Sequence, residues 1–339
     1  MKKFSSLFTV VLLCLSTVFF SCIPTGCSSD KKHLRNVTLN EVAHSLFYAP
    51  MYVAIENGYF EDEGIDLTLV TGFGADKTMT ALLSNDADIG FMGPETTVYA
   101  YNEGANDYVI NFAQLTQRAG NFLVARTEMK NFSWSDLQGK TVLGGRKGGM
   151  PEMVFEYILK KNNLDPSADL IINQNIDFGS TAAAFSGGQG DFSVEFEPGA
   201  TSLEAEGNGY VVASLGVDSG YIPYTAFSAK SSYLKENPEI IQSFTNAVQK
   251  GLDYVNSHTP EEIAKVISPQ FKETDLNTIT TIITRYANQD TWKTDTIFEE
   301  ESYDLLLDIL DEAGELSAYP AYTDLTDTSF AREAKERVR

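Results

Sequence analysis

The chain has 339 residues, of which 43% are hydrophobic and 21% are charged, so its composition predicts a packed globular core rather than disorder. This length suffices for one large domain or for two lobes of ordinary size. The formal net charge of −22 disfavours binding to nucleic acid or docking of the protein surface on an anionic membrane, because like charges repel.

The first residues have the pattern of a secretory signal. Lys2 and Lys3 precede an apolar run over 7–20 that is too short to span a bilayer comfortably. All three cysteines, Cys14, Cys22 and Cys27, lie in this region. We therefore expect an extracytoplasmic protein whose mature body has neither disulfides nor thiol chemistry.

The end of this segment resembles a bacterial lipoprotein signal, in which a cysteine after small residues is lipidated and becomes the first residue. Cys27 follows Thr25 and Gly26 and fits better than Cys22, which has bulky Phe19 and Phe20 nearby; Cys22 remains the alternative. The resemblance implies a signal peptide over 1–27, a tether over 28–35, and a lipid anchor on the outer face of the bacterial cell membrane. An ordinary secreted protein is the competing interpretation.

Strand-like and helix-like segments alternate from residue 36 onward. This alternation predicts βαβ units and a largely parallel sheet with helices on both faces. The predicted strands are 36–43, 65–72, 88–93, 108–116, 121–128, 141–145, 169–176, 191–197 and 209–216. The predicted helices are 49–64, 75–87, 95–104, a segment starting at Pro151, 180–188 and 200–207.

The segments form two α/β halves, joined near 117–122 and again near 220–226. We assign 36–117 plus 224–339 to lobe 1 and 118–223 to lobe 2. The last third is mostly helical, because Asn237-Pro238 and the capping box over 259–262 start helices whose apolar residues recur at helical spacing.

Sequence signatures of catalysis are absent. The only Gly-Lys-Thr lacks the leading glycine of a phosphate-binding loop, since Trp134 stands there, and no Gly-x-Ser-x-Gly occurs. His33, His44 and His258 are far apart, so a histidine metal site is not expected. We predict no catalytic residues, no metal and no cofactor.

The stretch VLGGRKGGMPEMVF combines glycines with the start of a helix. Gly148 and Gly149 allow positive φ and close approach of a ligand to the backbone, and Pro151 marks the first helical turn. Unpaired N–H groups at such a turn suit an acceptor or anionic group, and Arg146 could add a charged donor. The alternative is a tight turn with Arg146 in solvent.

Three other turns have the same character, over 44–52, 71–78 and 90–97. Aromatic residues at these turns and near the second crossing could wall in a ligand, although core packing is equally compatible with each. We expect a hydrogen-bonded structural role for His44 rather than ligand contact. The residues at these positions that are proposed to contact ligand are Phe47, Tyr48, Phe73, Gly74, Gly93, Arg146, Gly148, Gly149, Met150 and Tyr224.

The phrases NGYFEDEGIDLTLV, GFGADKTMTALLSNDADIGFMGPE, FLVAR, DLQGKTV and GDFSVEFEPGA resemble the extracytoplasmic solute-binding proteins of ABC importers for nitrate, sulfonates, taurine and thiamine pyrimidine precursors. The resemblance implies a two-lobed periplasmic-binding-protein-like (type II) α/β fold. Each lobe would have a mixed, mostly parallel sheet flanked by helices, and ligand would bind between the lobes. In the family, the positions that match Ser45, Tyr48, Gly74, Gly93, Gly149 and the acidic residues before Pro198 tend to face the cleft, which adds Ser45 and Glu195 to the residues expected to contact ligand. Glu195 could accept a hydrogen bond from a ligand amine, and Glu197-Pro198 could be structural.

The resemblance also implies function: a monomeric, lipid-anchored receptor that passes a small solute to an ABC permease and its ATPase. The solute would be a thiamine-pyrimidine-precursor-like heteroaromatic or a sulfonate or nitrate. A pyrimidine-synthase-like enzyme on the same fold is an alternative, but its cysteine-rich motif is absent from the mature body. A ligand-sensing receptor is the other alternative.

Overall fold

The computed structural model describes residues 34–176 and 178–338. The predicted signal peptide over 1–27, both candidate lipidated cysteines and most of the tether lie outside the described residues. None of the described helices is long and apolar enough to cross a membrane.

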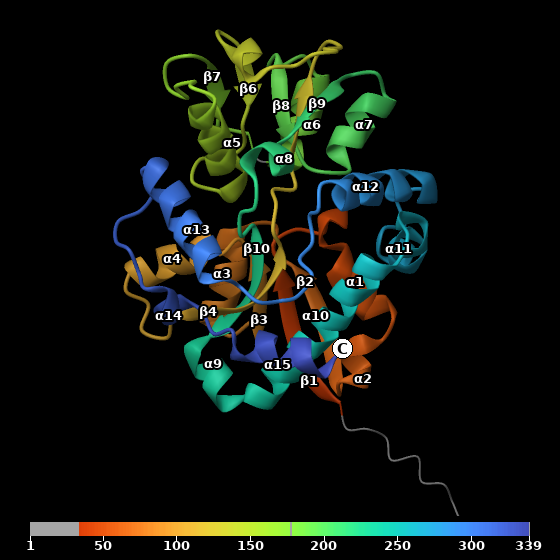
Figure 1. The fold of residues 1–339 in the computed structure, drawn as a ribbon, viewed down its shortest axis with the longest axis vertical. Helices are drawn as coiled ribbons and strands as arrows, with labels where there is room; N and C mark the ends of the chain where they lie inside the picture. Colours follow the sequence, from red (N-terminus) through yellow and green to blue (C-terminus); the bar gives the residue numbers. More distant parts are fainter. Residues whose placement is uncertain (1–33, 177, 339) are drawn as a thin grey trace, which may run out of the picture. The chain divides into compact units, whose positions relative to one another are not determined.

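Two five-stranded sheets organise the described chain (Figure 1). The first has the order β2-β1-β3-β10-β4 and the second has the order β7-β6-β8-β5-β9. The strands of the first are β1 (Arg35–Glu41), β2 (Ile65–Thr71), β3 (Ile89–Met92), β4 (Val109–Thr116) and β10 (Thr225–Lys230). Those of the second are β5 (Phe122–Ala125), β6 (Thr141–Leu143), β7 (Ile171–Asn173), β8 (Phe192–Glu195) and β9 (Tyr210–Ser214).

One strand in each sheet runs against the other four. β10 is antiparallel to β3 and β4, and β5 is antiparallel to β8 and β9, whereas β1 pairs in parallel with β2 and β3 and β6 pairs in parallel with β7 and β8. Each reversed strand directly follows a connection between the two sheets. The expected mixed, mostly parallel sheets are therefore confirmed, and the reversed strand in each comes from the chain entering after a crossing.

Helices flank both sheets. The α-helices are α1 (Ala49–Glu56), α2 (Tyr59–Asp62), α3 (Ala75–Ser84), α4 (Glu95–Asn102), α5 (Met150–Lys161), α6 (Phe178–Ser186), α7 (Gly199–Ala205), α8 (Leu215–Ser219), α9 (Ser231–Glu236), α10 (Pro238–Ser257), α11 (Pro260–Ile267), α12 (Leu276–Asn288), α13 (Glu300–Glu312), α14 (Tyr322–Leu325) and α15 (Ser329–Arg337). Three short 3₁₀ turns are η1 (Leu46–Tyr48), η2 (Trp134–Leu137) and η3 (Ser268–Gln270).

The single helix predicted over 49–64 is wrong, because the structure has two. Gly58 adopts φ 72°, a left-handed conformation that ends the α-helical path between α1 and α2. The sequence pattern also did not predict α8 and α9 as helices. Each has only five or six residues, too short for apolar periodicity to show, so their helical form depends on tertiary packing.

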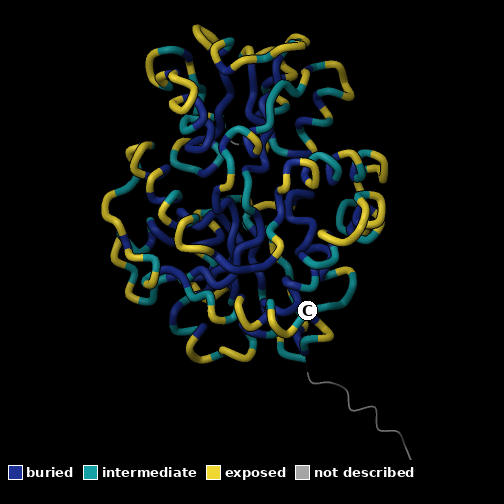
Figure 2. The backbone as a smooth tube through the Cα atoms, in the orientation of Figure 1, coloured by how far each residue is buried: buried dark blue, intermediate teal, exposed yellow. Residues whose placement is uncertain are grey.

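The core of the first sheet is aromatic and tightly packed. Phe91 of β3 stacks on Phe227 of β10 with ring centroids 4.3 Å apart, and Phe227 meets Phe244 of α10 edge to face at 5.2 Å. The inner strands β3, β10, β5 and β8 are almost entirely buried, whereas the edge strands β2, β7 and β9 are mostly exposed or half-buried (Figure 2). This rigid core fixes the strand ends from which the candidate site is built.

Candidate functional site

The three predicted turns of the first half lie at one edge of the first sheet. Because β1, β2 and β3 are parallel neighbours, the turns after them leave from the same end of the sheet. Ser45 accepts the Phe47 N–H at 3.3 Å and starts η1. Gly74, at φ 151°, donates its N–H to the Val42 carbonyl at 3.0 Å and precedes α3.

The glycine turn between β6 and α5 reaches across to these elements. Tyr99 of α4 donates its hydroxyl hydrogen to the Gly148 carbonyl at 3.1 Å, and Arg146 lies 3.5 Å from the Asp76 carboxylate of α3. The Met150 N–H is directed at the Glu95 carboxylate. We call the contact between 144–150 and the elements α3 and α4 the seam.

Two buried carboxyls lie at the start of α5. The Gly148 N–H donates to Glu152 at 3.1 Å, and the Met150 N–H lies near Glu95 and lowers its pKa. Burial raises the pKa of Glu152 to about 8. The sequence predicted these N–H groups to be available to ligand; the structure instead pairs the Gly148 N–H with Glu152 and brings Glu95 near the Met150 N–H, in line with the partial positive charge of a helix N-terminus.

Glu95 stands at the beginning of α4, directly after the Gly93-Pro94 turn. Its side chain is 4% exposed, and its Oε2 has no hydrogen-bond partner among the described residues. Burial raises the pKa of Glu95 to about 7, opposed by the Met150 N–H and the charge of Arg146. Sequence reasoning missed this residue, although an acidic residue directly after a Gly-Pro strand end was a usable signal.

An aromatic cluster adjoins Glu95. The Phe47 ring lies 5.2 Å from Tyr48 and 5.6 Å from Tyr224, measured between centroids, and Tyr48 packs edge to face on Phe91 at 4.6 Å. Burial raises the pKa of Tyr48 and of Tyr224, with smaller contributions from Glu41 and Glu95 at Tyr48 and from Tyr48 and Glu95 at Tyr224. The pairing of Ala226 with Met92 brings Tyr224 to the end of β3, where Glu95 starts α4. Phe47, Tyr48 and Tyr224 are therefore brought together as the sequence suggested, inside the core.

Asn121 lies beside this cluster on the first crossing between the sheets. It is fully buried; its Oδ1 accepts the Tyr224 hydroxyl hydrogen, and its Nδ2 has no hydrogen-bond partner in the described part of the chain. Sequence analysis did not single out Asn121, because an asparagine before a strand carries no distinctive pattern.

Glu195 and Glu197 have different environments at the end of β8. Glu195 accepts hydrogen bonds from Ser193 and, at 3.0 Å, from Thr181, and burial raises its pKa to about 7. Glu197 is paired with Arg285 at 2.8 Å and precedes a cis peptide bond to Pro198. The ion pair supports the structural role expected for Glu197-Pro198.

Two expected ligand residues lie apart from the buried cluster. Phe73 is 76% exposed and has φ 58°, and Arg146 is largely exposed beside Asp76. The structural role expected for His44 is confirmed: it bonds Glu41 at 2.9 Å, Tyr52 at 3.1 Å and the Gln270 carbonyl at 3.0 Å.

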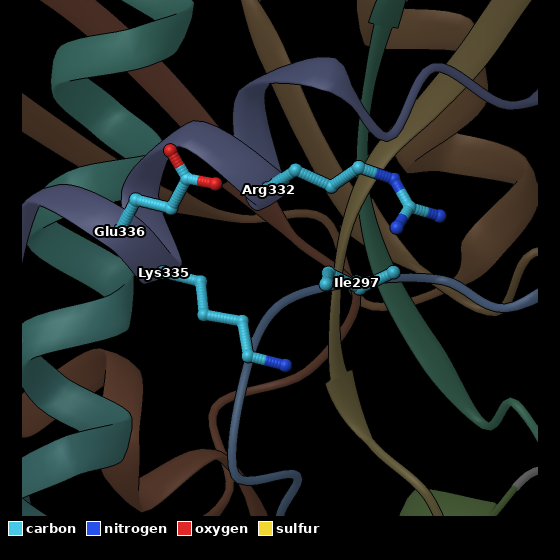
Figure 3. Close-up of a pocket in the computed structure, with 4 residues that line it drawn as sticks. All are labelled: Ile297, Arg332, Lys335 and Glu336. Atoms are coloured by element: carbon cyan, nitrogen blue, oxygen red, sulfur yellow. The ribbon is translucent and has the colours of Figure 1, made fainter.

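Two surface cavities lie elsewhere. One of about 420 Å³ is lined by Ile297, Arg332, Lys335 and Glu336 (Figure 3), and one of about 370 Å³ is lined by His44 and residues 269–274. Neither includes Glu95, Asn121 or Tyr224, all of which are buried. Among the described residues no cluster of three histidine, cysteine or acidic side chains could hold a metal ion.

The chain has two mixed sheets flanked by helices, and each sheet has one reversed strand that follows a crossing between the sheets. This arrangement, with glycine turns that meet at the seam, defines the periplasmic-binding-protein-like class. The sequence model of the family described as NMT1/THI5 like matches residues 47–263, more than half of the chain. The chain belongs to this family.

Named relatives and a solved structure agree with that class. The chain is 44% identical over 320 residues to "Putative binding protein YtlA" of Bacillus subtilis, covering 94% of this chain and 96% of that one. It is 23% identical over 269 residues to the formylaminopyrimidine-binding protein of Halalkalibacterium halodurans, covering 78% and 79%. The nitrate-binding protein NrtA of Synechocystis PCC 6803 superposes with a TM-score of 0.74 at 15% identity, covering 90% and 89%.

Proposed function

We propose that this protein is the solute-binding subunit of an ABC-type importer and captures a small polar or heteroaromatic solute between two lobes. We take the lobes to be 36–117 plus 224–339 and 118–223. The observation that carries the proposal is the seam together with the aromatic cluster of Phe47, Tyr48 and Tyr224, where Glu95 and Asn121 are buried and each has a polar atom without a hydrogen-bond partner among the described residues. Family membership and the binding-protein names of the relatives support the same class.

Solute entry requires the seam to open, since Glu95, Asn121 and Tyr224 are buried. The two crossings between the sheets, 117–121 and 220–224, are the segments about which the lobes would rotate. The contacts of Tyr99 with Gly148 and of Arg146 with Asp76 would then form on closure. Hinge closure of this kind buries the polar groups of the solute against fixed protein groups, and this sets specificity.

The proposed ligand contacts combine the residues predicted from sequence with Glu95 and Asn121. Ser45, Tyr48, Gly74 and Gly93 would line the lobe 1 side, Gly149, Met150 and Glu195 the lobe 2 side, and Phe73 the exposed lip. Of the two solute classes, we favour the pyrimidine-like one over the sulfonate or nitrate one. One relative is named for binding a formylaminopyrimidine, and two buried acidic side chains, Glu95 and Glu152, lie at and beside the seam.

The experiment is a thermal-shift screen of the mature protein with aminopyrimidines, taurine, alkanesulfonates and nitrate. A solute present at 100 times its Kd stabilises the folded state by about 2.7 kcal/mol, which raises Tm by several degrees. The variant Tyr48→Ala should lose the shift, whereas Tyr210→Ala, on an exposed part of β9, should retain it. If no solute in any class stabilises the protein, the proposed function is wrong.

We further propose that the protein is a monomer without enzymatic activity and that a lipid on Cys27 anchors it. A permease would recognise the closed form of the protein. Metabolic labelling with a radioactive fatty acid tests the anchor: Cys27→Ser should abolish labelling and Cys22→Ser should leave it. If only Cys22→Ser abolishes labelling, the lipidated residue is Cys22, the alternative cysteine. If both variants are still labelled, neither cysteine is the only lipidated residue.

A further inference from the structure

Two buried acidic side chains lie at the start of α5, the position where an anionic ligand would be expected. Glu152 accepts the Gly148 N–H, and the Met150 N–H lies near Glu95. Burial raises the pKa of both carboxyls, and the charge of Arg146, which is largely exposed and bound to Asp76, partly opposes this at Glu95. An anionic solute would compete with the chain's own carboxyls for these amides, and its charge would raise their pKa values further.

Two buried atoms at the seam have unused hydrogen-bonding capacity. Glu95 Oε2 is an acceptor and Asn121 Nδ2 is a donor, and neither has a partner among the described residues. Buried polar atoms in native proteins are overwhelmingly paired, so such atoms mark positions where a ligand or water completes the structure. The acceptor comes from α4 and the donor from the first crossing, so the two atoms belong to separate elements.

Tyr224 links these two atoms. Its hydroxyl donates to Asn121 Oδ1, and the pairing of Ala226 in β10 with Met92 in β3 brings Tyr224 to the end of β3, where Glu95 starts α4. Phe47 packs on Tyr48 and on Tyr224. The unused acceptor and donor thus come from elements that meet at one aromatic cluster.

We infer that Glu95 and Asn121 determine specificity, and that the solute is a neutral or cationic ring compound that donates an N–H to Glu95 and accepts from Asn121. This inference rests on the proposed function and narrows it. A donor bound at Glu95 would supply the partner that its Oε2 lacks, whereas a solute without one would leave the carboxyl buried and unpaired. Sites of this kind strongly reject analogues that lack the hydrogen-bonding group.

The test compares 4-aminopyrimidine with 4-methylpyrimidine, which has nearly the same shape but no N–H donor, and with nitrate and methanesulfonate. Binding to the mature protein is measured by isothermal titration calorimetry. We expect 4-aminopyrimidine to bind at least 100-fold more tightly than 4-methylpyrimidine, in line with sites built to hydrogen-bond a substrate group. We expect no measurable binding of the two anions.

The variants Glu95→Gln and Asn121→Leu should each weaken 4-aminopyrimidine at least tenfold. Thr296→Val is the matched control, because Thr296 also has a buried oxygen without a partner among the described residues but lies on the loop before α13. This variant should bind 4-aminopyrimidine as tightly as the unaltered protein does. Circular dichroism establishes that each variant is folded; should one variant fail to fold, the other variant and the two pyrimidines on the unaltered protein still decide the outcome.

Two results would overturn the inference and leave the proposed function intact: tight binding of nitrate or methanesulfonate that Glu95→Gln does not weaken, or 4-aminopyrimidine binding that neither variant affects. Equal affinity for the two pyrimidines would likewise remove the role of the N–H donor. If none of the four solutes binds and the wider screen also finds nothing, the inference and the proposed function fail together.

Discussion

The hydroxyl of Tyr99 donates to the carbonyl of Gly148 over 3.1 Å, joining α4 beside the first sheet to the glycine turn that follows β6 of the second. Gly148 adopts φ 76°, a conformation that a residue with a side chain rarely takes, and this conformation presents its carbonyl to Tyr99. A pair of residues distant in sequence thus reports directly on whether the seam is closed.

Replacing Tyr99 with phenylalanine should shift the protein toward an open form. A neutral hydrogen bond contributes about 0.5–1.5 kcal/mol, so the closed population should fall about two- to tenfold. Because all three cysteines lie within 1–27, the mature chain can be labelled at Leu83→Cys and Ile171→Cys for single-molecule energy transfer. Tyr101→Phe is the control, since its hydroxyl meets Asp324 at 3.4 Å away from the seam. An unchanged distribution in Tyr99→Phe would contradict this role.

Arg285 should be important for stability. Its guanidinium bonds Glu197, which is fully buried, at 2.8 Å and also bonds Glu204. Arg285→Leu leaves the Glu197 charge buried without its partner, and such losses cost about 3–5 kcal/mol. Urea denaturation measures the free energy of unfolding. Arg337→Leu removes an exposed pair with Glu333 and should change it by less than about 0.5 kcal/mol; equal effects of the two variants would refute the assignment.

Stability should fall as pH rises through the range set by Glu195. Burial raises the folded-state pKa of Glu195 to about 7 from its ordinary value of 4.5, so between these pH values the folded protein holds a proton there that the unfolded chain has lost. Between about pH 5 and pH 8 this group should lower the free energy of unfolding by up to about 3 kcal/mol.

The variant Glu195→Gln should remove this part of the pH dependence, because its amide does not titrate. Denaturation curves collected at pH 5, 6.5 and 8 provide the comparison. Exposed Glu336→Gln should retain the pH dependence of the unaltered protein. A profile for Glu195→Gln parallel to that of the unaltered protein would show that the carboxyl is ionised in the folded state at ordinary pH.

Two glycine substitutions should have opposite effects. A methyl group on Gly251 of α10 would stand 2.1 Å from the Pro50 carbonyl oxygen of α1, so Gly251→Ala should destabilise the protein by about 1–3 kcal/mol. A methyl group on Gly179 of α6 meets nothing within 4 Å, so Gly179→Ala should be neutral or stabilise by up to about 1 kcal/mol. Thermal unfolding measures both, and a stable Gly251→Ala would mean that α1 and α10 can separate without cost.

The sequence by itself determined the two α/β halves, the strand-to-helix turns and the helices with clear apolar spacing. These features depend on local patterns: alternation of apolar residues, Gly-Pro turns, and caps such as Thr259 with Glu262. It also identified Tyr48, Gly93, Gly149 and Tyr224 as candidate contacts, because they lie at strand ends that the βαβ pattern brings to one edge. The split at Gly58 was missed because a single helical stripe runs across it.

Only the tertiary structure decided which polar groups meet. Glu95 and Tyr224 come to the same end of the first sheet because β10 pairs with β3, and no local pattern encodes that pairing. The same packing brings the Gly148 amide to Glu152 and leaves Asn121 Nδ2 without a hydrogen-bond partner among the described residues. Which side chains meet across the two sheets depends on where each strand that follows a crossing pairs within its sheet. Burial then shifts the pKa of each carboxyl and so sets its protonation.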